Sequence, residues 1–152
     1  MVETHSFKRS HNIMIDAPAE AVLDYVCNPN SWPEWIAASH KIDSPDRPLR
    51  KGDTFVEEWH TRSGRAQLKW EVTECEPPYL WVGETQTDFI GTIIVRYDVK
   101  EMGDQVRFTR TMINPARPKP PTQDQINRLN KEADIALANI KKNVEARIAK
   151  AS

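Results

Sequence analysis

The chain has 152 residues, and its 21 Lys and Arg against 22 Asp and Glu give a formal net charge of −1. A chain of this length forms one domain around one core, so we expect a single domain over residues 1–152. The balanced charge argues against a surface for nucleic acid or anionic lipid, because both bind to a basic excess.

Membrane, secreted and disordered proteins are also disfavoured by the sequence. No stretch approaches the roughly 18 apolar residues of a membrane span, and Met1 to Ser10 lacks the apolar core of a secretion signal. The five Trp and the low net charge argue against disorder. We therefore expect a cytoplasmic protein, either a monomer or a dimer, in which Cys27 and Cys75 are buried thiols.

The N-terminal region predicts one strand followed by two short helices. Alternation of apolar and polar residues favours a strand from Phe7 to Ile15. Asp16 to Glu20 is typical of a helix start, with Pro18 at the first helical position. Ser31 to Glu34 has the spacing of a capping box and predicts a second short helix from Ser31. The residues expected to anchor it are Trp32, Trp35 and Ile36.

From Lys41 to Asn114 the hydrophobic period is two, which predicts about six strands. The residues expected to share the inward face are Phe55, Glu57, Trp59, Ala66, Leu68, Trp70, Val72, Ile93, Val95, Tyr97, Val99, Val106, Phe108, Arg110 and Met112. Turn signals such as Lys51-Gly52-Asp53 and Gly103-Asp104 separate the strands. Short connections of this kind predict antiparallel neighbours with one apolar face.

The last segment predicts a long amphipathic helix over about residues 123–150. Thr122 and Gln125 fit a capping box at its start. Apolar residues then recur at steps of three and four, at Ile126, Leu129, Ala133, Leu137, Ile140, Val144 and Ile148. The small side chains of Ala133 and Ala136 leave room above the middle of this stripe. The proline-rich segment Asn114 to Pro121 before the helix predicts a stiff, extended connector.

These elements make an α+β chain with one apolar sheet face and one apolar helix stripe. The two cover each other most economically when a curved antiparallel sheet wraps around the C-terminal helix. A helix about 10 Å across cannot fill a sheet of about seven strands. The remaining space must hold either large side chains, the five Trp among them, or a ligand.

The same sequence resembles the START/SRPBCC superfamily in its polyketide cyclase/dehydrase-like branch, which has the birch-pollen-allergen-like fold. The resemblance covers about Ser6 to Ala149 and includes the closing helix. The motifs that carry it are Ile13 to Val22, Asn30 to Trp35, Lys51 to Asp53, and Trp70 to Glu74 leading into Pro77-Pro78.

This resemblance implies a helix-grip fold, in which a curved seven-stranded sheet grips the last helix around an apolar cavity, with two short helices between strands one and two. Relatives bind lipids, sterols or polyketides, cyclise aromatic polyketides, or serve as interaction domains. The superfamily has no shared catalytic signature to carry over onto residues of this chain. The resemblance therefore favours small apolar ligands and goes no further.

Two polar residues are expected on the apolar face of the sheet. If Phe55 points inward, Glu57 does as well, and the same rule turns Arg110 inward with Phe108. A buried charge must pair or meet a ligand. Arg110 would donate to a carbonyl or enolate oxygen, and Glu57 would act as a base near neutral pH, because burial disfavours the charged carboxylate. The structural alternatives are a β-bulge that turns one of them to solvent, or a salt bridge between them.

Three functions follow from these observations. The first is binding of a hydrophobic lipid, polyketide or aromatic molecule, at a site lined by Phe55, Trp59, Trp70, Tyr97, Phe108, Met112, Leu129, Ala133, Ala136 and Leu137. The second is an enzyme of the polyketide cyclase, aromatase or dehydratase type, with Glu57 and Arg110 as catalytic residues. The third is a protein-interaction domain with a filled core, against which the polar outer-face residues Lys69, Glu71 and Arg107 argue.

No metal, nucleotide or other cofactor is expected. The four histidines, at positions 5, 11, 40 and 60, show no metal-ligand spacing, and no glycine-rich phosphate loop is present. Cys27 and Cys75 have no histidine nearby in the sequence to activate them as nucleophiles.

Overall fold

The computed structural model describes residues 4–36, 39–61 and 64–151. The elements in chain order are β1 (His5–Ile15), α1 (Ala19–Val26), the 3-10 helix η1 (Pro29–Glu34), β2 (Ser39–Asp43), β3 (Thr54–Thr61), β4 (Gly64–Glu76), β5 (Leu80–Thr87), β6 (Gly91–Met102), β7 (Gln105–Arg117) and α2 (Gln123–Ala151). The strands form one seven-stranded antiparallel sheet in the order β1-β7-β6-β5-β4-β3-β2. The predicted α+β helix-grip arrangement is confirmed.

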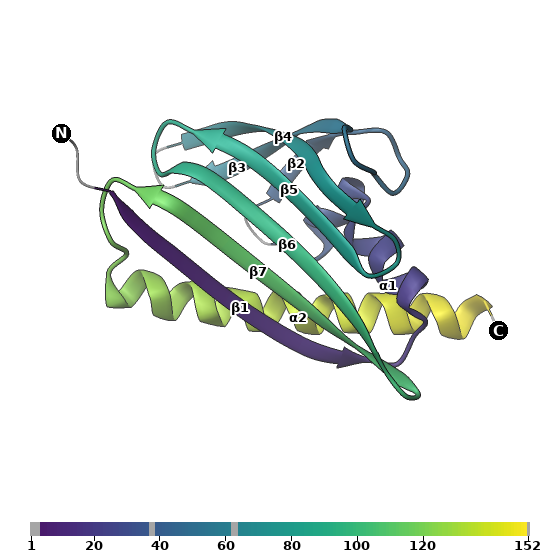
Figure 1. Ribbon diagram of the computed structural model, residues 1–152. Helices are drawn as coiled ribbons and strands as arrows, with labels where there is room; N and C mark the ends of the chain where they lie inside the picture. The colour runs from purple at the N-terminus through teal and green to yellow at the C-terminus, as the bar shows by residue number, and fades with distance from the viewer. Residues whose placement is uncertain (1–3, 37–38, 62–63, 152) are drawn as a thin grey trace.

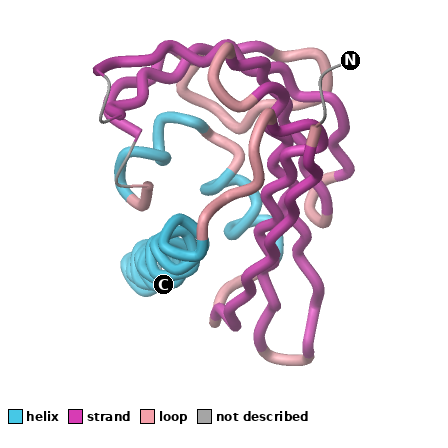
Figure 2. Tube along the Cα trace, turned by 90° about the vertical axis from the view of Figure 1, so that its left-hand side faces the viewer, coloured by secondary structure: helices cyan, strands magenta, loops and turns pink. Residues whose placement is uncertain are grey.

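The sheet bends into an arch, and all helical segments lie on its concave side. Figure 1 shows α2 running across the sheet, and Figure 2 shows the arch from the side. Because side chains alternate along a strand, every second residue of β6 turns inward, and Val95, Tyr97 and Val99 are buried. The core therefore lies between the sheet, α1, η1 and α2.

The start of α2 is the predicted capping box. The Gln125 backbone N–H donates to Thr122 Oγ1 over 3.1 Å, and the Thr122 backbone N–H donates to Gln125 Oε1 over 2.9 Å. The buried residues of the helix follow the predicted stripe and are Ala133, Ala136, Leu137, Ile140 and Val144. Among the helices of the described residues, none combines the length and the apolar composition that a membrane crossing requires.

The second short helix differs from the prediction. It is a 3-10 helix that begins at Pro29, and the Asn28 side chain caps it by accepting the Asn30 backbone N–H over 3.1 Å. The Ser31 hydroxyl instead donates to the Tyr25 carbonyl over 2.7 Å and accepts the Trp35 indole N–H over 3.1 Å. The expected start at Ser31 was therefore wrong by two residues. Pro18 was expected as the first residue of α1, but the helix begins at Ala19 and Pro18 is its N-cap.

The extended connector before α2 is also shorter than expected. β7 continues through Pro115 to Arg117, because β1 pairs with it along its whole length, from Ile15 opposite Val106 to His5 opposite Arg117. Pairing with β1 thus extends the strand into the proline-rich segment.

An aromatic cluster fills the central part of the arch. Trp32 of η1 is 2% exposed, and its ring lies edge-on to the rings of Trp35, Phe55, Trp70 and Trp81 at centroid distances of 5.2–6.2 Å. Its indole N–H donates to the Val26 carbonyl over 2.9 Å. The space beneath the sheet was expected to hold either large side chains or a ligand, and in this central part it holds large side chains.

The two halves of α2 are held differently. In the C-terminal half, Arg147 donates to Glu34 over 3.1 Å, and Asn143 donates to the Tyr25 hydroxyl over 2.9 Å. The burial of Ile140 and Val144 shows close packing in this half. Toward the N-terminal end, Ile126 and Leu129 are only partly buried, and this end of the helix leaves space beneath the arch.

Candidate functional site

An open cleft of about 440 Å³ lies between the N-terminal half of α2 and the concave face of the sheet. Sites for small molecules have volumes of about 300–1,000 Å³. The end of η1 and strands β1, β3 and β7 supply the other walls. The lining residues are Arg9, His11, Pro33, Glu34, Trp35, Ile36, Trp59, Arg110, Met112, Gln125, Arg128, Leu129, Glu132, Ala133, Ile135, Ala136 and Asn139.

A second, much smaller cavity of about 20 Å³ lies deeper in the arch. Its walls share Ile36, Trp59, Arg110 and Met112 with the cleft, so the two spaces adjoin. The deeper walls are Trp32, Glu57, Trp70, Ile93, Val95 and Tyr97. The cleft therefore ends at a small space with polar side chains in its wall.

The structure distributes the expected ligand-binding residues over three environments. Those that line the cleft are Trp59, Met112, Leu129, Ala133 and Ala136. Trp70 and Tyr97 line the small cavity. Phe55, Phe108 and Leu137 line neither space and are buried in the core.

Glu57 and Arg110 both face the interior of the arch. The pairing of β3 with β4 and of β6 with β7 runs without a register shift past these residues, so no bulge turns either to solvent. Glu57 is 1% exposed, and its Oε1 accepts the Trp70 indole N–H over 3.0 Å. The Arg110 guanidinium lies 5.7 Å from the centre of the Trp35 ring. The ion pairs that the structure describes include none between Glu57 and Arg110.

Besides Glu57 Oε2, three polar atoms in the wall of the small cavity are shielded from solvent. They are Trp59 Nε1, Arg110 Nε and the Tyr97 hydroxyl oxygen, and none has a hydrogen-bond partner of acceptable geometry among the residues that the structure describes. Burial raises the pKa of Tyr97 well above its ordinary value, and the nearby positive charge of Arg110 opposes this rise. The hydroxyl therefore keeps its proton, and together the three groups present hydrogen-bond donors to the cavity.

The sequence interpretation missed the contribution of β1 and of the second flank of α2. His11 lies opposite Arg110 in the sheet and lines the cleft, where its Nε2 is 2.9 Å from Asn130 Oδ1. The parity rule applied to Glu57 would have found it, because His11 shares one face of β1 with the apolar residues Ile13 and Ile15. On α2, Arg128, Glu132, Ile135 and Asn139 recur at helical spacing beside the apolar stripe.

The two cysteines are poor nucleophiles. Burial raises the pKa of the Cys27 thiol to about 12, although the Arg50 guanidinium, 3.5 Å from its sulfur, acts in the opposite direction. Burial also raises the pKa of Cys75, which is only partly buried, contrary to expectation. Within the described ranges, no group of three or more His, Cys, Asp or Glu side chains could hold a metal ion.

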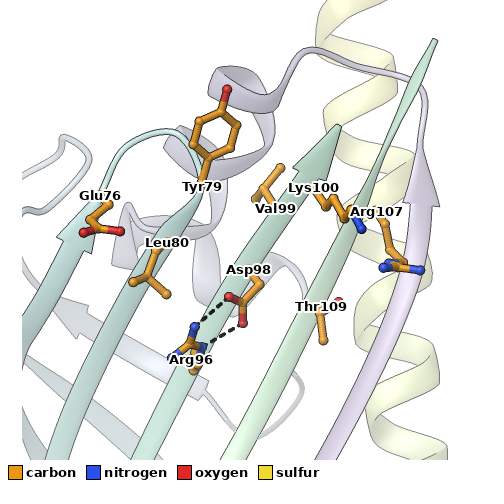
Figure 3. Close-up of a pocket in the computed structure, with 9 residues that line it drawn as sticks. All are labelled: Glu76, Tyr79, Leu80, Arg96, Asp98, Val99, Lys100, Arg107 and Thr109. Atoms are coloured by element: carbon orange, nitrogen blue, oxygen red, sulfur yellow. Dashed lines mark hydrogen bonds and ion pairs between the residues drawn. The ribbon is translucent and has the colours of Figure 1, made fainter. Parts of the chain in front are cut away.

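A hollow of about 360 Å³ on the outer face of the sheet has a different character. Figure 3 shows it between β5, β6 and β7, with an ion pair at 2.9 Å between Arg96 Nε and Asp98 Oδ2 on its floor. Lys100 and Arg107 lie beside this pair. Its charged surface suits an apolar molecule less well than the cleft does.

Residues 5–145 match the model of the protein family described as "Polyketide cyclase / dehydrase and lipid transport". The chain belongs to this family. The chain is also similar to the curated protein Penitrem biosynthesis cluster 1 protein I from Penicillium ochrochloron, with 33% identity over 117 residues, or 72% of this chain and 76% of that protein. The predicted relation to polyketide cyclases is therefore confirmed.

Solved structures agree with this assignment at the level of the fold. The Zhui aromatase/cyclase from Streptomyces sp. R1128 superposes with a TM-score of 0.73 at 11% identity, over 95% of this chain and 96% of that chain. The di-domain ARO/CYC StfQ from the steffimycin biosynthetic pathway gives 0.75 at 12% identity, over 95% of this chain and 52% of that chain. Ara h 8.0201 gives 0.70 at 7% identity, over 93% and 99% of the two chains.

Proposed function

We propose that this member of the polyketide cyclase/dehydrase and lipid transport family works in the cytoplasm and binds a hydrophobic small molecule in the cleft. The observation that carries the proposal is the cleft itself: about 440 Å³ of space open to solvent, with Trp59, Met112, Leu129 and Ala136 in its walls. Such walls favour a flat aromatic, polyketide or lipid molecule. An open cleft also weighs against an interaction domain with a filled interior.

The comparisons support a ligand of biosynthetic origin. The curated relative is named for a penitrem biosynthesis cluster, and two structural relatives are aromatase/cyclases. These names suggest that the ligand of this chain is an intermediate or product of a similar synthesis.

Filling the cleft tests this function. Ala136 is 4% exposed and lines the cleft, so Ala136→Phe places a ring in the space that the ligand would occupy. The neutral dye N-phenyl-1-naphthylamine, whose fluorescence increases in apolar surroundings, serves as the probe. We expect Ala136→Phe to weaken its binding at least about tenfold, a loss of about 1.4 kcal/mol.

The matched control is Ala138→Phe, which adds the same ring on the exposed side of α2. It is expected to bind the dye as the wild type does, and thermal melting followed by circular dichroism shows whether both variants are folded. Equal dye affinity in the two folded variants, or no dye binding by the wild type, would overturn the proposed function.

A second function is an enzyme that moves a proton next to a carbonyl group, as a polyketide cyclase or dehydratase does. This function is favoured by the carboxyl group of Glu57, which is 1% exposed and lies with Arg110 in the wall of the small cavity. Glu57 would take the proton from carbon, and Arg110 would stabilise the negative charge that develops on oxygen.

A further inference from the structure

We propose that the small cavity is an oxygen pocket, which accepts one neutral carbonyl oxygen of the molecule bound in the cleft. The oxygen pocket is the space of about 20 Å³ in whose wall Trp59, Tyr97 and Arg110 lie. This inference rests on the proposed binding function and deepens it, because it names the chemical group that the ligand must carry.

The size of the oxygen pocket limits what it can hold. A space of at least about 10–15 Å³ takes one water molecule, so about 20 Å³ takes one oxygen atom and no ring. The pocket opens toward the cleft, since Trp59, Arg110 and Met112 line both spaces. A molecule in the cleft can therefore reach it with one projecting group while its apolar body stays between the sheet and α2.

The polar atoms of the wall determine the chemistry of that group. The indole N–H of Trp59 and the Nε–H of Arg110 can only donate hydrogen bonds, and both nitrogens are shielded from solvent and lack partners in the described part of the chain. The Tyr97 side chain is 0% exposed, and its hydroxyl is in the same situation. Buried donors without acceptors are costly, and a carbonyl oxygen with two lone pairs supplies an acceptor to them.

The charges in the wall favour a neutral acceptor over an anion. Arg110 brings a positive charge, but the Glu57 carboxyl group lines the same space and is 1% exposed. A ligand carboxylate would place a second acidic group beside Glu57, and two carboxyl groups that share a poorly solvated space oppose each other's ionised form. A ketone or ester oxygen uses the same donors without this repulsion.

Three naphthalenes that differ in a single substituent test the oxygen pocket. They are 2-acetylnaphthalene, its isostere 2-isopropenylnaphthalene, in which CH₂ replaces the oxygen, and 2-naphthoate. Isothermal titration calorimetry of the wild type is expected to show at least about tenfold tighter binding of the ketone than of the isopropenyl compound, because a site built of donors rejects an analogue that lacks the acceptor. The anion is expected to bind more weakly than the ketone.

Variants then assign the preference to the pocket. Tyr97→Phe keeps the ring and removes the hydroxyl, so it should weaken ketone binding about threefold or more and leave the isopropenyl compound unchanged. Trp59→Phe removes another donor from a half-buried position and provides the same readout if the buried Tyr97 variant does not fold. The control is Tyr79→Phe, a tyrosine that is 50% exposed.

The outcomes separate this inference from the proposed function. Equal affinity of the wild type for the ketone and the isopropenyl compound, or tightest binding of 2-naphthoate, overturns the oxygen pocket while binding in the cleft stands. A ketone preference that the Tyr97 and Trp59 variants keep in full also overturns it. If the wild type binds neither the three naphthalenes nor N-phenyl-1-naphthylamine, both proposals are wrong.

Discussion

Replacing Trp32 by Ala is expected to lower the free energy of unfolding by about 3–5 kcal/mol, as truncation of a large buried side chain does. Trp32 is 2% exposed and lies at the centre of the aromatic cluster, so its removal deprives four surrounding rings of their packing partner. It also leaves the Val26 carbonyl without its indole donor. Urea denaturation followed by fluorescence measures the change.

The comparison variant for Trp32 is Phe89→Ala. Phe89 is 45% exposed, and its truncation should change the free energy of unfolding by no more than about 0.5 kcal/mol. If Trp32→Ala were no more destabilising than Phe89→Ala, the centre of the arch would not be the closely packed cluster described above.

Replacing Glu57 by Gln is expected to slow exchange of the methyl protons of 2-acetylnaphthalene in D₂O at least about 100-fold, if the chain is an enzyme. In this reaction Glu57 takes a proton from the methyl carbon, and the electrons of the C–H bond move to the carbonyl oxygen beside Arg110. The proton on Glu57 exchanges with D₂O, and a deuteron then returns to the carbon, so no reactant besides the solvent is needed. The amide of Gln keeps the shape of the side chain but cannot accept the proton.

Nuclear magnetic resonance follows the loss of the methyl proton signal. The matched control is Glu58→Gln, which changes the next carboxylate on β3, outside the small cavity and 3.5 Å from Arg65. We expect Glu58→Gln to exchange as fast as the wild type, and Glu57→Gln to bind the ketone with nearly unchanged affinity. Exchange by the wild type at the rate of buffer alone, or equal rates in the two variants, would rule out the enzyme.

The strands and the inward side chains could be predicted because a strand alternates strictly. The period of two placed Glu57 and Arg110 inside, and the absence of a register shift beside them kept that parity. The capping residues Thr122 and Gln125 likewise predicted the start of α2, because both partners lie within one helical turn.

The division of the interior into a filled and an open part could not be predicted. It depends on how η1 lies under the arch, and Trp32 reaches the rings of Phe55 and Trp70 only through that tertiary contact. The sequence showed Trp32 as an anchor but contained no signal for the space that it fills. Phe55 and Phe108, which were expected at the ligand, are buried and line neither the cleft nor the small cavity.

Intermolecular nuclear Overhauser effects from bound N-phenyl-1-naphthylamine test the location of the ligand most directly. The account predicts contacts from the dye to the methyl groups of Ala133, Ala136 and Met112, which line the cleft. Contacts only to Leu80 and Thr109, in the hollow on the outer face of the sheet, would contradict it.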